Sequence, residues 1–215
     1  MDLIFLIPFC IGFYLLGNIS PSLIVSWAKR KDLRKVGSGN AGTTNMVRAF
    51  GFKLAVPVLI LDILKGVIPG LVGFFVFNDY YLAMLALGLS TVLGHCFPVL
   101  MKFKGGKGAA TITGLFLVVN PVTTSIIFTT CLLIFFIFEK ASISSILLMC
   151  TIAVWEIVHI DSSNATAIAS IGLLIIFMLL ILFTHRTNVV SLLGGTEKRI
   201  SIISKLKARK KKTQR

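Results

Sequence analysis

Long apolar runs, separated by short polar or basic segments, make up most of the chain. Seven runs are predicted to form membrane helices: Leu3–Trp27, Leu54–Phe77, Leu82–Met101, Ala109–Val119, Val122–Phe138, Ser142–Val158 and Ala165–Phe183. A helix needs about 20 apolar residues to cross a bilayer, so most of these runs are long enough to span it. The first run contains Gly17, Asn18, Ser20 and Pro21, which predict a kink or an unwound turn within it. The pattern predicts an all-α, polytopic integral membrane protein.

Lysine and arginine are concentrated in the segments between the runs. Lys29–Lys53 carries seven, residues 102–107 carry three and the chain from Arg186 onward carries ten, whereas residues 78–81 carry none. The positive-inside rule therefore places these three segments in the cytoplasm and the N-terminus outside. The stretch 109–138 suits either one long span or two short helices broken at Asn120–Pro121. Because the basic C-terminal segment is placed in the cytoplasm, the number of crossings favours two helices and about seven in all, or a re-entrant pair equivalent to them. The first of the two is too short to span alone, so we expect protein to shield it or the preceding glycine-rich residues to extend it.

The composition excludes an ordinary soluble protein, since 56% of the residues are hydrophobic. The formal net charge of +14 is compatible with nucleic-acid binding, but the basic residues flank membrane runs, so we expect no nucleic acid partner. Four cysteines without paired spacing and eight acidic residues without a cluster indicate neither a metal nor a cofactor. We expect one transmembrane domain over residues 1–200. The basic tail over 201–215 is expected to be a solvated end or a binder of anionic headgroups.

The Gly94–Thr111 segment, GHCFPVLMKFKGGKGAAT, combines lysine with glycine between two apolar runs. The lysines are Lys102, Lys104 and Lys107, and the glycines among them are Gly105, Gly106 and Gly108. Glycine lets backbone N–H groups approach an anion closely, and a helix N-terminus favours negative charge. The segment is therefore predicted to bind phosphate, although the lysines alone are also explained as markers of the cytoplasmic side. His95, near the end of the preceding run, is interpreted equally well as a packing residue or as a site residue.

The Gly37–Gly51 segment, GSGNAGTTNMVRAFG, is rich in small polar residues. Its candidate site residues supply hydroxyls, amides, flexible backbone and one guanidinium, and they are Ser38, Gly39, Asn40, Thr43, Thr44, Asn45 and Arg48. Such residues form anion-binding nests, and arginine grips phosphate with two parallel hydrogen bonds. The alternative is a cytoplasmic loop that caps the following helix. The pattern G-x-x-x-x-G-K-[ST] is absent from the sequence, so an ATP-binding P-loop is not supported.

The His185–Arg199 segment, HRTNVVSLLGGTEKR, follows the last apolar run directly. His185 and Asn188 are three residues apart and share one face if the helix continues. Glu197 is a rare carboxylate among many cations, and a structural ion pair is its favoured role. Asp62 and Lys65 lie inside a predicted span, where unpaired charge is costly, so we expect them to pair or to face the site.

In their order and composition, these three segments resemble the bacterial acyl-phosphate–glycerol-3-phosphate acyltransferase family, the PlsY type. The family pattern is approximately GSGNxGATNxxR, GHxFPxFLxFKGGKGxAT and HxxNIxRLxxGxExK, and its counterparts here are Gly37–Arg48, Gly94–Thr111 and His185–Lys198. Thr43 replaces an alanine, Val189 an isoleucine and Ser191 an arginine, so a side chain able to contact phosphate is absent at position 191. The apolar segments LGNISPS and LDILKG are also family-like, so the resemblance covers most of the chain.

The resemblance implies a bacterial inner-membrane enzyme with its site at the cytoplasmic face. Such an enzyme acylates the 1-hydroxyl of glycerol 3-phosphate from an acyl phosphate, and it forms lysophosphatidic acid and phosphate in phospholipid synthesis. It does not use acyl-CoA or acyl carrier protein directly, and the H-x-x-x-x-D dyad of other acyltransferases is absent from this sequence. The expected partners are the two substrates, membrane lipids and, transiently, other phospholipid-synthesis enzymes.

An acyl phosphate already carries a good leaving group, so the enzyme mainly has to hold two anions together and orient a hydroxyl. The residues expected to hold phosphate or the developing oxyanion are Arg48, Lys104, Lys107, Ser38, Asn40 and Thr44, with the glycine loop. The candidate catalytic residues are Ser38, His185 and Asn188. The proton acceptor is either His185 or the departing phosphate. Ser38 has no evident adjacent base in the sequence to make it a covalent nucleophile.

Two other classes of protein fit part of the pattern. A transporter of a phosphorylated anionic solute would also have broken helices and basic loops, but its site should lie near the middle of the membrane, whereas these segments gather at one predicted face. A non-catalytic scaffold would have little use for three segments rich in hydrogen-bond donors. The acyltransferase interpretation explains all three segments together.

Overall fold

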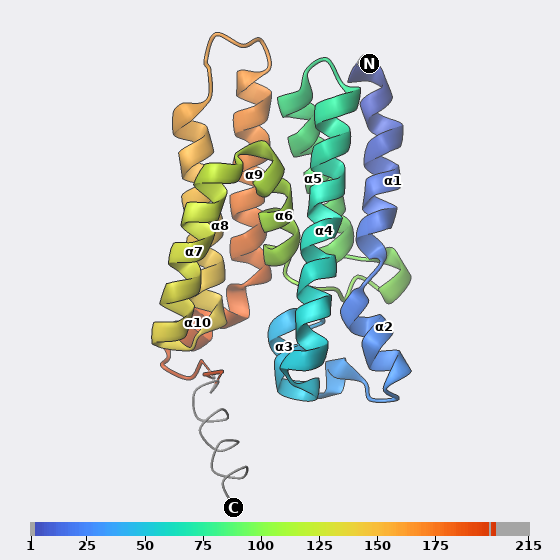
Figure 1. Ribbon diagram of the computed structural model, residues 1–215, viewed down its shortest axis with the longest axis vertical. Helices are drawn as coiled ribbons and strands as arrows, with labels where there is room; N and C mark the ends of the chain where they lie inside the picture. Colours follow the sequence, from blue (N-terminus) through green and yellow to red (C-terminus); the bar gives the residue numbers. More distant parts are fainter. Residues whose placement is uncertain (1–2, 198, 201–215) are drawn as a thin grey trace, which may run out of the picture.

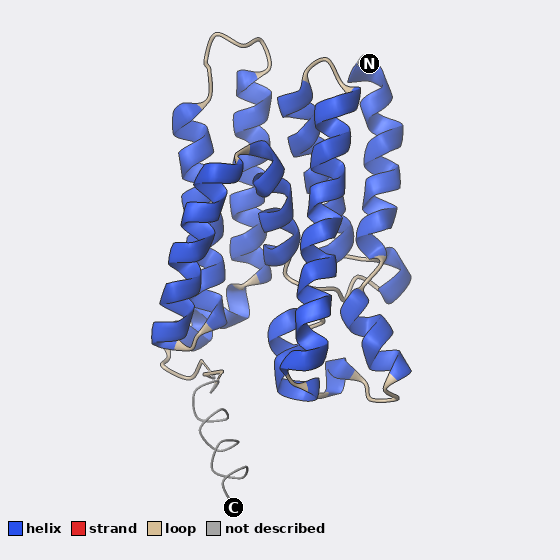
Figure 2. Cartoon of the chain, in the orientation of Figure 1, coloured by secondary structure: helices blue, strands red, loops and turns tan. Residues whose placement is uncertain are grey.

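The computed structural model describes residues 3–197 together with 199 and 200, and every regular element among them is a helix (Figures 1 and 2). The helices are α1 Leu6–Asn18, α2 Pro21–Ala28, α3 Thr43–Phe50, α4 Phe52–Val76, α5 Tyr80–Cys96, α6 Ala109–Val119, α7 Pro121–Phe138, α8 Ala141–His159, α9 Ala167–Thr184 and α10 Arg186–Leu193. Short 3-10 turns lie at Leu3–Phe5, Leu33–Lys35 and Val99–Met101. The prediction of an all-α fold is confirmed. The tail expected over 201–215 lies outside the described residues.

Six stretches of the described chain are long and apolar enough to cross a membrane. They are Leu6–Ala28, Phe52–Val76, Tyr80–Met101, Pro121–Phe138, Ala141–His159 and Ala167–Thr184. The remaining predicted segment is α6, an apolar helix of 11 residues. At 1.5 Å per residue α6 extends for roughly 16 Å, about half the hydrocarbon thickness of a bilayer. It packs against α4, α5 and α7, so protein shields it as the sequence predicted.

The predicted interruption of the first span is confirmed. α1 ends at Asn18, α2 begins at Pro21, and the two residues between them have extended backbone (Figure 1). Proline is tolerated in the first turn of a helix because its missing N–H has no partner there. The Asn18 side chain donates a hydrogen bond back to the Tyr14 carbonyl at 2.6 Å. The break therefore gives the chain a new direction and leaves carbonyl groups of α1 without helical partners.

The predicted break between α6 and α7 is also confirmed. α7 begins at Pro121, and the Asn120 side chain accepts a hydrogen bond from Thr123 N at 3.3 Å. Glu156 of α8 accepts hydrogen bonds from Asn120 Nδ2 at 3.2 Å and from Tyr81 Oη at 3.0 Å. The charge of Glu156 inside a membrane helix is thus stabilised by two donors. This buried carboxylate fixes the turn at one end of α6.

Close backbone contacts hold α4 against α6. A Cβ on Gly66 would lie 2.8 Å from the carbonyl carbon of Thr111, and a Cβ on Gly114 would lie 2.8 Å from that of Ile63. Real Cβ atoms do not approach so closely, so only glycine permits this packing. Small residues are the usual means of bringing membrane helices together. The contact fixes the depth of α6 and hence the position of its N-terminus.

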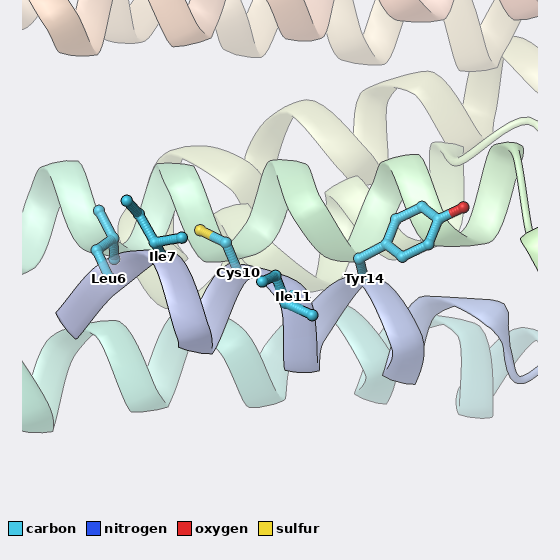
Figure 3. A pocket seen from close by; sticks show the side chains of 5 residues that line it. All are labelled: Leu6, Ile7, Cys10, Ile11 and Tyr14. Carbon is cyan, nitrogen blue, oxygen red and sulfur yellow. The ribbon is translucent and has the colours of Figure 1, made fainter. Parts of the chain in front are cut away.

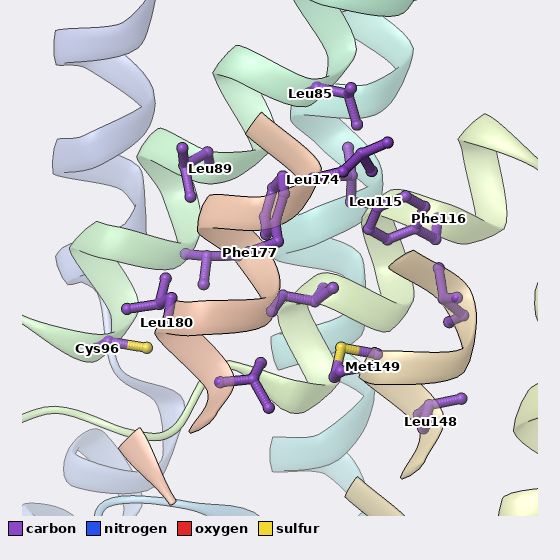
Figure 4. Close-up of a cluster of buried hydrophobic side chains, with 14 of the residues drawn as sticks. Leu85, Leu89, Cys96, Leu115, Phe116, Leu148, Met149, Leu174, Phe177 and Leu180 are labelled. Carbon is purple, nitrogen blue, oxygen red and sulfur yellow. The ribbon is translucent and has the colours of Figure 1, made fainter. Parts of the chain in front are cut away.

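The main hydrophobic cluster lies between α5, α6, α8 and α9, as Figure 4 shows. Leu85, Leu115 and Leu174 are fully buried there, and the rings of Phe116 and Phe177 meet edge to face with centroids 5.8 Å apart. Large apolar side chains also cover the outer faces of the helices, as expected where lipid replaces water as the solvent. These outward side chains explain why the chain is more hydrophobic than a soluble protein with a core of the same size.

The outer face of α1 shows the same pattern in detail. Figure 3 shows Leu6, Ile7, Cys10, Ile11 and Tyr14 along α1, where they line a shallow apolar hollow. Only Tyr14 carries a polar atom beyond the thiol, and its hydroxyl donates to the Phe97 carbonyl at 2.8 Å. That bond ties α1 to the start of the loop that follows α5.

Figure 1 shows α3 and α10, which belong to two of the three polar segments, toward the lower end of the molecule. The start of α1 lies at the opposite end. The loop between α5 and α6 crosses the molecule well above the lower ends of α4 and α7, so it is recessed between the helices. The fold thus brings segments that are far apart in the sequence into one region.

Candidate active site

Asn45 holds the first polar segment in shape. Its Oδ1 accepts a hydrogen bond from Ser38 N at 3.0 Å, and its Nδ2 donates to the carbonyls of Leu33 and Val36, each at 2.9 Å. The side chain is only 1% exposed. Its polar atoms are therefore occupied inside the protein, and the structure gives Asn45 a role in shaping the loop in place of the predicted contact with substrate. Gly39, with φ at +71°, allows the loop to turn here.

The N-terminus of α3 faces a cavity. α3 begins at Thr43, and Gly42 before it makes no side-chain cap. The first N–H groups of a helix have no partner within the helix and carry partial positive charge. Asn40, Thr43 and Thr44 line the cavity at this point. The segment therefore presents hydroxyl, amide and backbone donors to the same space, as the sequence predicted.

The Gly105 and Gly106 N–H groups are not free to bind phosphate. They donate to the carbonyls of Cys96 at 3.2 Å and His95 at 3.0 Å, so they cap the C-terminus of α5. A Cβ on Gly106 would lie 2.8 Å from His95 Cε1, so glycine is needed for close packing. The prediction that these N–H groups cradle the anion was wrong, because the end of α5 has orphan carbonyls that they satisfy. The Lys104 side chain is exposed and is not among the residues that line the cavities described below.

Gly108 and the start of α6 do face the cavity. Gly108 has φ at +86°, a left-handed conformation that glycine adopts without strain. The first hydrogen bond within α6 runs from Ile112 N to the Gly108 carbonyl at 2.9 Å. Gly108, Ala109 and Ala110 line the cavity, so the N-terminus of α6, with its orphan N–H groups, borders it. Two helix N-termini, those of α3 and α6, thus border one space that favours an anion.

Two adjacent cavities occupy this region of the described structure. The first has a volume of about 330 Å³ and is mainly apolar, with walls that include Leu59, Phe128, Leu132, Phe135 and Leu148. The second has a volume of about 460 Å³ and is mainly polar, with walls that include Ser38, Gly39, Arg48, Asn188 and Glu197. Asn40 and Lys107 line both cavities. The pair of cavities can therefore hold a polar anion beside an apolar chain.

Lys107 stands where the two cavities meet. Its Nζ donates to Asn188 Oδ1, and its backbone carbonyl accepts a hydrogen bond from Thr184 Oγ1 at 3.1 Å. Burial lowers the pKa of Lys107 to about 8; the Glu197 carboxylate opposes this shift, and the Arg48 guanidinium adds to it. Lys107 is therefore cationic at neutral pH but close to its point of deprotonation. Its hold on α9 and α10 fixes the ammonium group in position.

Asn188 and Glu197 form a hydrogen-bonded chain behind Lys107. Asn188 Nδ2 donates to the two oxygens of Glu197 at 2.9 and 3.1 Å, and Ser142 Oγ donates to Glu197 Oε1 at 2.6 Å. The sequence favoured a structural ion pair for Glu197, and the structure gives it a structural role through hydrogen bonds. Ser142 was not predicted as a site residue, because nothing in the sequence distinguishes it from other small residues of an apolar helix.

His185 is buried beside the same cavities and is neutral. Its side chain is 3% exposed and lines the apolar cavity. Nδ1 lies 3.0 Å from the Ile181 carbonyl, which can only accept, so Nδ1 carries the proton and Nε2 is left as an acceptor. Burial lowers the pKa of His185 to about 4, and the charge of Lys107 acts in the same direction. The imidazole is therefore a hydrogen-bond acceptor over the whole physiological pH range.

The fold brings most of the predicted site residues together. The predicted residues that line a cavity are Ser38, Gly39, Asn40, Thr43, Thr44, Arg48, His95, Lys107, Gly108, His185 and Asn188. The predicted residues that do not are Asn45, Lys104, Gly105 and Gly106, and of these Asn45, Gly105 and Gly106 support the loops from behind.

The fold and the site define a multi-pass membrane protein in which a polar cavity lies beside an apolar one. The family model described as "Glycerol-3-phosphate acyltransferase" matches residues 7–195. This chain belongs to that family.

Glycerol-3-phosphate acyltransferases from several bacteria align with almost the whole chain. Glycerol-3-phosphate acyltransferase of Aquifex aeolicus is 38% identical over 93% of this chain and 100% of its own length. The protein of the same name from Mycoplasmopsis pulmonis is 34% identical over 89% of this chain and 92% of its own length. The solved structure of PlsY, an integral membrane glycerol 3-phosphate acyltransferase, in its glycerol 3-phosphate form superposes with a TM-score of 0.85 and 36% identity, covering 94% of this chain and 98% of that one. Its lysophosphatidic acid form gives a TM-score of 0.81 and 34% identity, covering 92% and 96%.

Proposed function

We propose that this protein transfers an acyl chain from an acyl phosphate to the 1-hydroxyl of sn-glycerol 3-phosphate, forming lysophosphatidic acid and inorganic phosphate. The observation that carries the proposal is the position of Lys107, which lines both the polar and the apolar cavity. An ammonium at this junction can contact the phosphate of one substrate while the acyl chain of the other occupies the apolar space. The named relatives act on glycerol 3-phosphate, which matches the polar cavity.

Arg48, Lys107 and Ser38 are proposed to hold phosphate in the polar cavity. Two cations overcome the repulsion between the two phosphorylated substrates, and guanidinium binds phosphate through parallel N–H groups. The N-termini of α3 and α6 add partial positive charge at the carbonyl end of the acyl phosphate, where negative charge develops in the transition state. Asn188 acts as a positioning residue, because its amide oxygen accepts from Lys107 and its amide nitrogen donates to Glu197.

In the proposed reaction, the glycerol oxygen forms a bond to the acyl carbonyl carbon as the bond from that carbon to the phosphate oxygen breaks. The hydroxyl proton passes to the departing phosphate. His185 Nε2 accepts a hydrogen bond from the hydroxyl and orients it, because Nδ1 donates to the Ile181 carbonyl and leaves Nε2 as the acceptor. Holding both substrates in line supplies most of the rate enhancement.

The acyl chain is proposed to enter sideways from the bilayer. The apolar cavity is lined by Leu59 of α4 and by Leu132 and Phe136 of α7. Leu132 and Phe136 are also 41% and 47% exposed on the outer surface, so the same side chains face both the cavity and the lipid. A lipid-soluble donor can enter, and the lysolipid product can leave, without crossing a polar surface.

The proposed membrane arrangement follows the distribution of charge. The basic Lys29–Lys53 segment and α10, which begins at Arg186, lie toward the same end of the molecule, so we place this end at the cytoplasmic face of the inner membrane and the N-terminus outside. Residues 1–200 then form one catalytic domain, with the tail 201–215 in the cytoplasm. Transient contact with other phospholipid-synthesis enzymes would supply the acyl phosphate.

Release of inorganic phosphate by the purified protein in detergent tests the proposed function. With palmitoyl phosphate we expect release only when glycerol 3-phosphate is also present, with lysophosphatidic acid formed in equal amount. The release should survive EDTA, since no three His, Cys, Asp or Glu residues in the described part of the chain are grouped to hold a metal. A protein that is folded but inactive under these conditions would contradict the proposal, and uptake of glycerol 3-phosphate into sealed vesicles would then support a transporter.

The pH dependence of kcat/KM should show an alkaline limb near pH 8. Lys107 has a lowered pKa of about 8, so its charged form is present below that pH and is lost above it. His185, with its pKa lowered to about 4, stays neutral between pH 5 and 9 and adds no limb in that range. Substrate phosphate groups titrate near pH 6, and that limb should appear in every variant. Initial rates in buffers from pH 5 to 10 provide the measurement.

Two variants assign the alkaline limb to Lys107. Lys107→Arg should shift it out of the measurable range, because guanidinium stays protonated. Glu197→Gln should move it to lower pH, because the carboxylate that raises the pKa of Lys107 is removed. An alkaline limb that is the same in both variants and in the parent would show that another group is responsible.

A further inference from the structure

Three ionisable side chains are buried together between α1, α4 and α5. Asp62 and Lys65 lie one turn apart on α4, and His95 lies near the end of α5; they are 2%, 6% and 7% exposed. Lys65 Nζ is 3.5 Å from Asp62 Oδ1, so the expected pairing is confirmed. Apolar residues in place of a buried ion pair are often neutral or stabilising, so the pair is not explained by stability alone. Its neighbours indicate another role.

The Lys65 ammonium directs its three hydrogen-bond donors at the break in the first span and at His95. It donates to the Gly17 carbonyl at 3.2 Å, to the Ile19 carbonyl at 2.8 Å and to His95 Nδ1 at 3.0 Å. Both carbonyls lie where α1 stops, so they have no partner within the helix. An ammonium group has three donors, and these three acceptors match that number. Lys65 therefore stabilises the break between α1 and α2 and, at the same time, the ring of His95.

His95 transmits this restraint to the loop that carries Lys107. Since Lys65 can only donate, His95 Nδ1 accepts, and the ring is held in one orientation. The ring packs directly against Gly106, and the His95 carbonyl accepts the Gly106 N–H at 3.0 Å. Gly106 is followed by Lys107, the residue that both cavities share. A change in the orientation of His95 must therefore move Lys107.

The same break sets the direction of α2, which holds the first polar segment. Ser22 Oγ donates to the Ala41 carbonyl at 2.9 Å, and Leu33 N donates to Ser26 Oγ at 2.9 Å. Ala41 lies next to Asn40, the other residue that lines both cavities. Lys65 thus bonds to the break between α1 and α2 and to His95, and these two features orient the segments that carry Asn40 and Lys107.

We propose that Lys65 is a positioning residue of the acyltransferase site, with Asp62 as its charge partner. Lys65 joins the break between α1 and α2 to His95, and this connection sets the positions of Asn40 and Lys107 relative to each other. The inference rests on the proposed function for its kinetic consequence, but its geometric consequence is independent of activity. A displacement of about 1 Å at a reacting group can lower the rate of an enzyme by 10²-fold.

The test compares the full-length parent with Lys65→Met and with the double variant D62N/K65M. Lys65→Met leaves Asp62 buried without a partner, so its melting temperature should fall. The double variant removes both charges at similar volume, and its melting temperature should return close to that of the parent. Its kcat/KM for glycerol 3-phosphate should nevertheless stay about 10²-fold below that of the parent, with a raised KM. A purely structural pair predicts that stability and kinetics recover together.

Hydrogen–deuterium exchange of the peptide covering residues 94–111 provides the readout that does not depend on activity. We expect faster exchange of this peptide in the double variant, because the Gly106 N–H bond to the His95 carbonyl loosens. His95→Leu removes the ring acceptor and keeps the charge pair, so it should show the same faster exchange. If the double variant does not fold, this variant tests whether the contact between Lys65 and His95 holds the loop. The matched control is Glu156→Gln, which removes a buried charge from α8 and should leave the exchange of 94–111 and the KM unchanged.

A double variant with parental melting temperature, kinetics and loop exchange would overturn the positioning role and leave the proposed function intact. A parent without turnover dependent on glycerol 3-phosphate would contradict the proposed function instead. The exchange of residues 94–111 would then still decide whether Lys65 holds the loop.

Discussion

Replacing Lys107 with methionine is expected to lower kcat/KM by about 10³-fold, which corresponds to ~4 kcal/mol of transition-state stabilisation. Lys107 lines both cavities, and Asn188 holds its ammonium in position. Methionine keeps the length and the apolar stem of the side chain but removes the charge and its donors. The repulsion between two phosphorylated substrates is then opposed mainly by Arg48. Steady-state phosphate release, with each substrate varied in turn, measures the loss in kcat and in both KM values.

Two further lysines serve as comparisons for this variant. Lys53→Met removes one charge from an exposed side chain near the start of α4. Lys53 lines neither cavity, so we expect kcat/KM to stay within about threefold of the parent. Lys104→Met separates the sequence-based prediction from the structure, because Lys104 belongs to the same loop but has an exposed side chain. Equal losses from Lys104→Met and Lys107→Met would contradict the assignment of Lys107 as the shared cation.

Gly106→Ala is expected to lower kcat/KM by about 10²-fold. An added Cβ would lie 2.8 Å from His95 Cε1 and 3.0 Å from His95 Cδ2, so the loop or the ring must move. The ring cannot turn freely, because Lys65 Nζ donates to its Nδ1 at 3.0 Å. The loop therefore shifts and carries Lys107 away from its productive position, where about 1 Å is enough to cause this loss. We expect the KM for glycerol 3-phosphate to rise as well as kcat to fall.

Gly172→Ala is the matched control for this substitution. Gly172 lies in α9, and nothing lies within 4 Å of an added Cβ there. In a helix interior this change should stabilise the protein by about 0.5–1 kcal/mol and leave turnover unchanged. Thermal unfolding of both variants in the same detergent shows whether Gly106→Ala acts through the site or through overall stability. Parental kinetics in a folded Gly106→Ala protein would be evidence that the loop does not position Lys107.

Most of the fold was predictable because a bilayer imposes simple rules. Backbone polar groups in hydrocarbon must be paired within the element, so long apolar runs in a chain of this composition become helices. The interruptions were also predictable, because Pro21 and Pro121 each follow polar residues; proline alone does not decide, since α4 continues through Pro57 and Pro69. The half-length of α6 followed from the distance between Gly108 and Asn120 along the chain.

The site was predictable only to the level of segments. Composition marked the three polar segments as phosphate binders, but it did not separate Lys107 from Lys104. That difference arises because the chain turns between them, with Gly105 and Gly106 bonded to the end of α5. The sequence does not distinguish a glycine that contacts phosphate from a glycine that packs against a histidine ring. Only the neighbours of each residue in space distinguish the two roles.

By itself, the sequence determined the helical class, the positions of both helix breaks and the three segments that form the site, because each depends on local composition and on neighbours along the chain. The tertiary structure alone decided which residues of those segments meet. It placed Asn40 and Lys107 at the junction of two cavities, turned Asn45, Gly105 and Gly106 inward as supports, and bonded Lys65 to the break in the first span. The physical reason is that burial and hydrogen-bond satisfaction depend on contacts between helices far apart in the chain, and these contacts follow from packing.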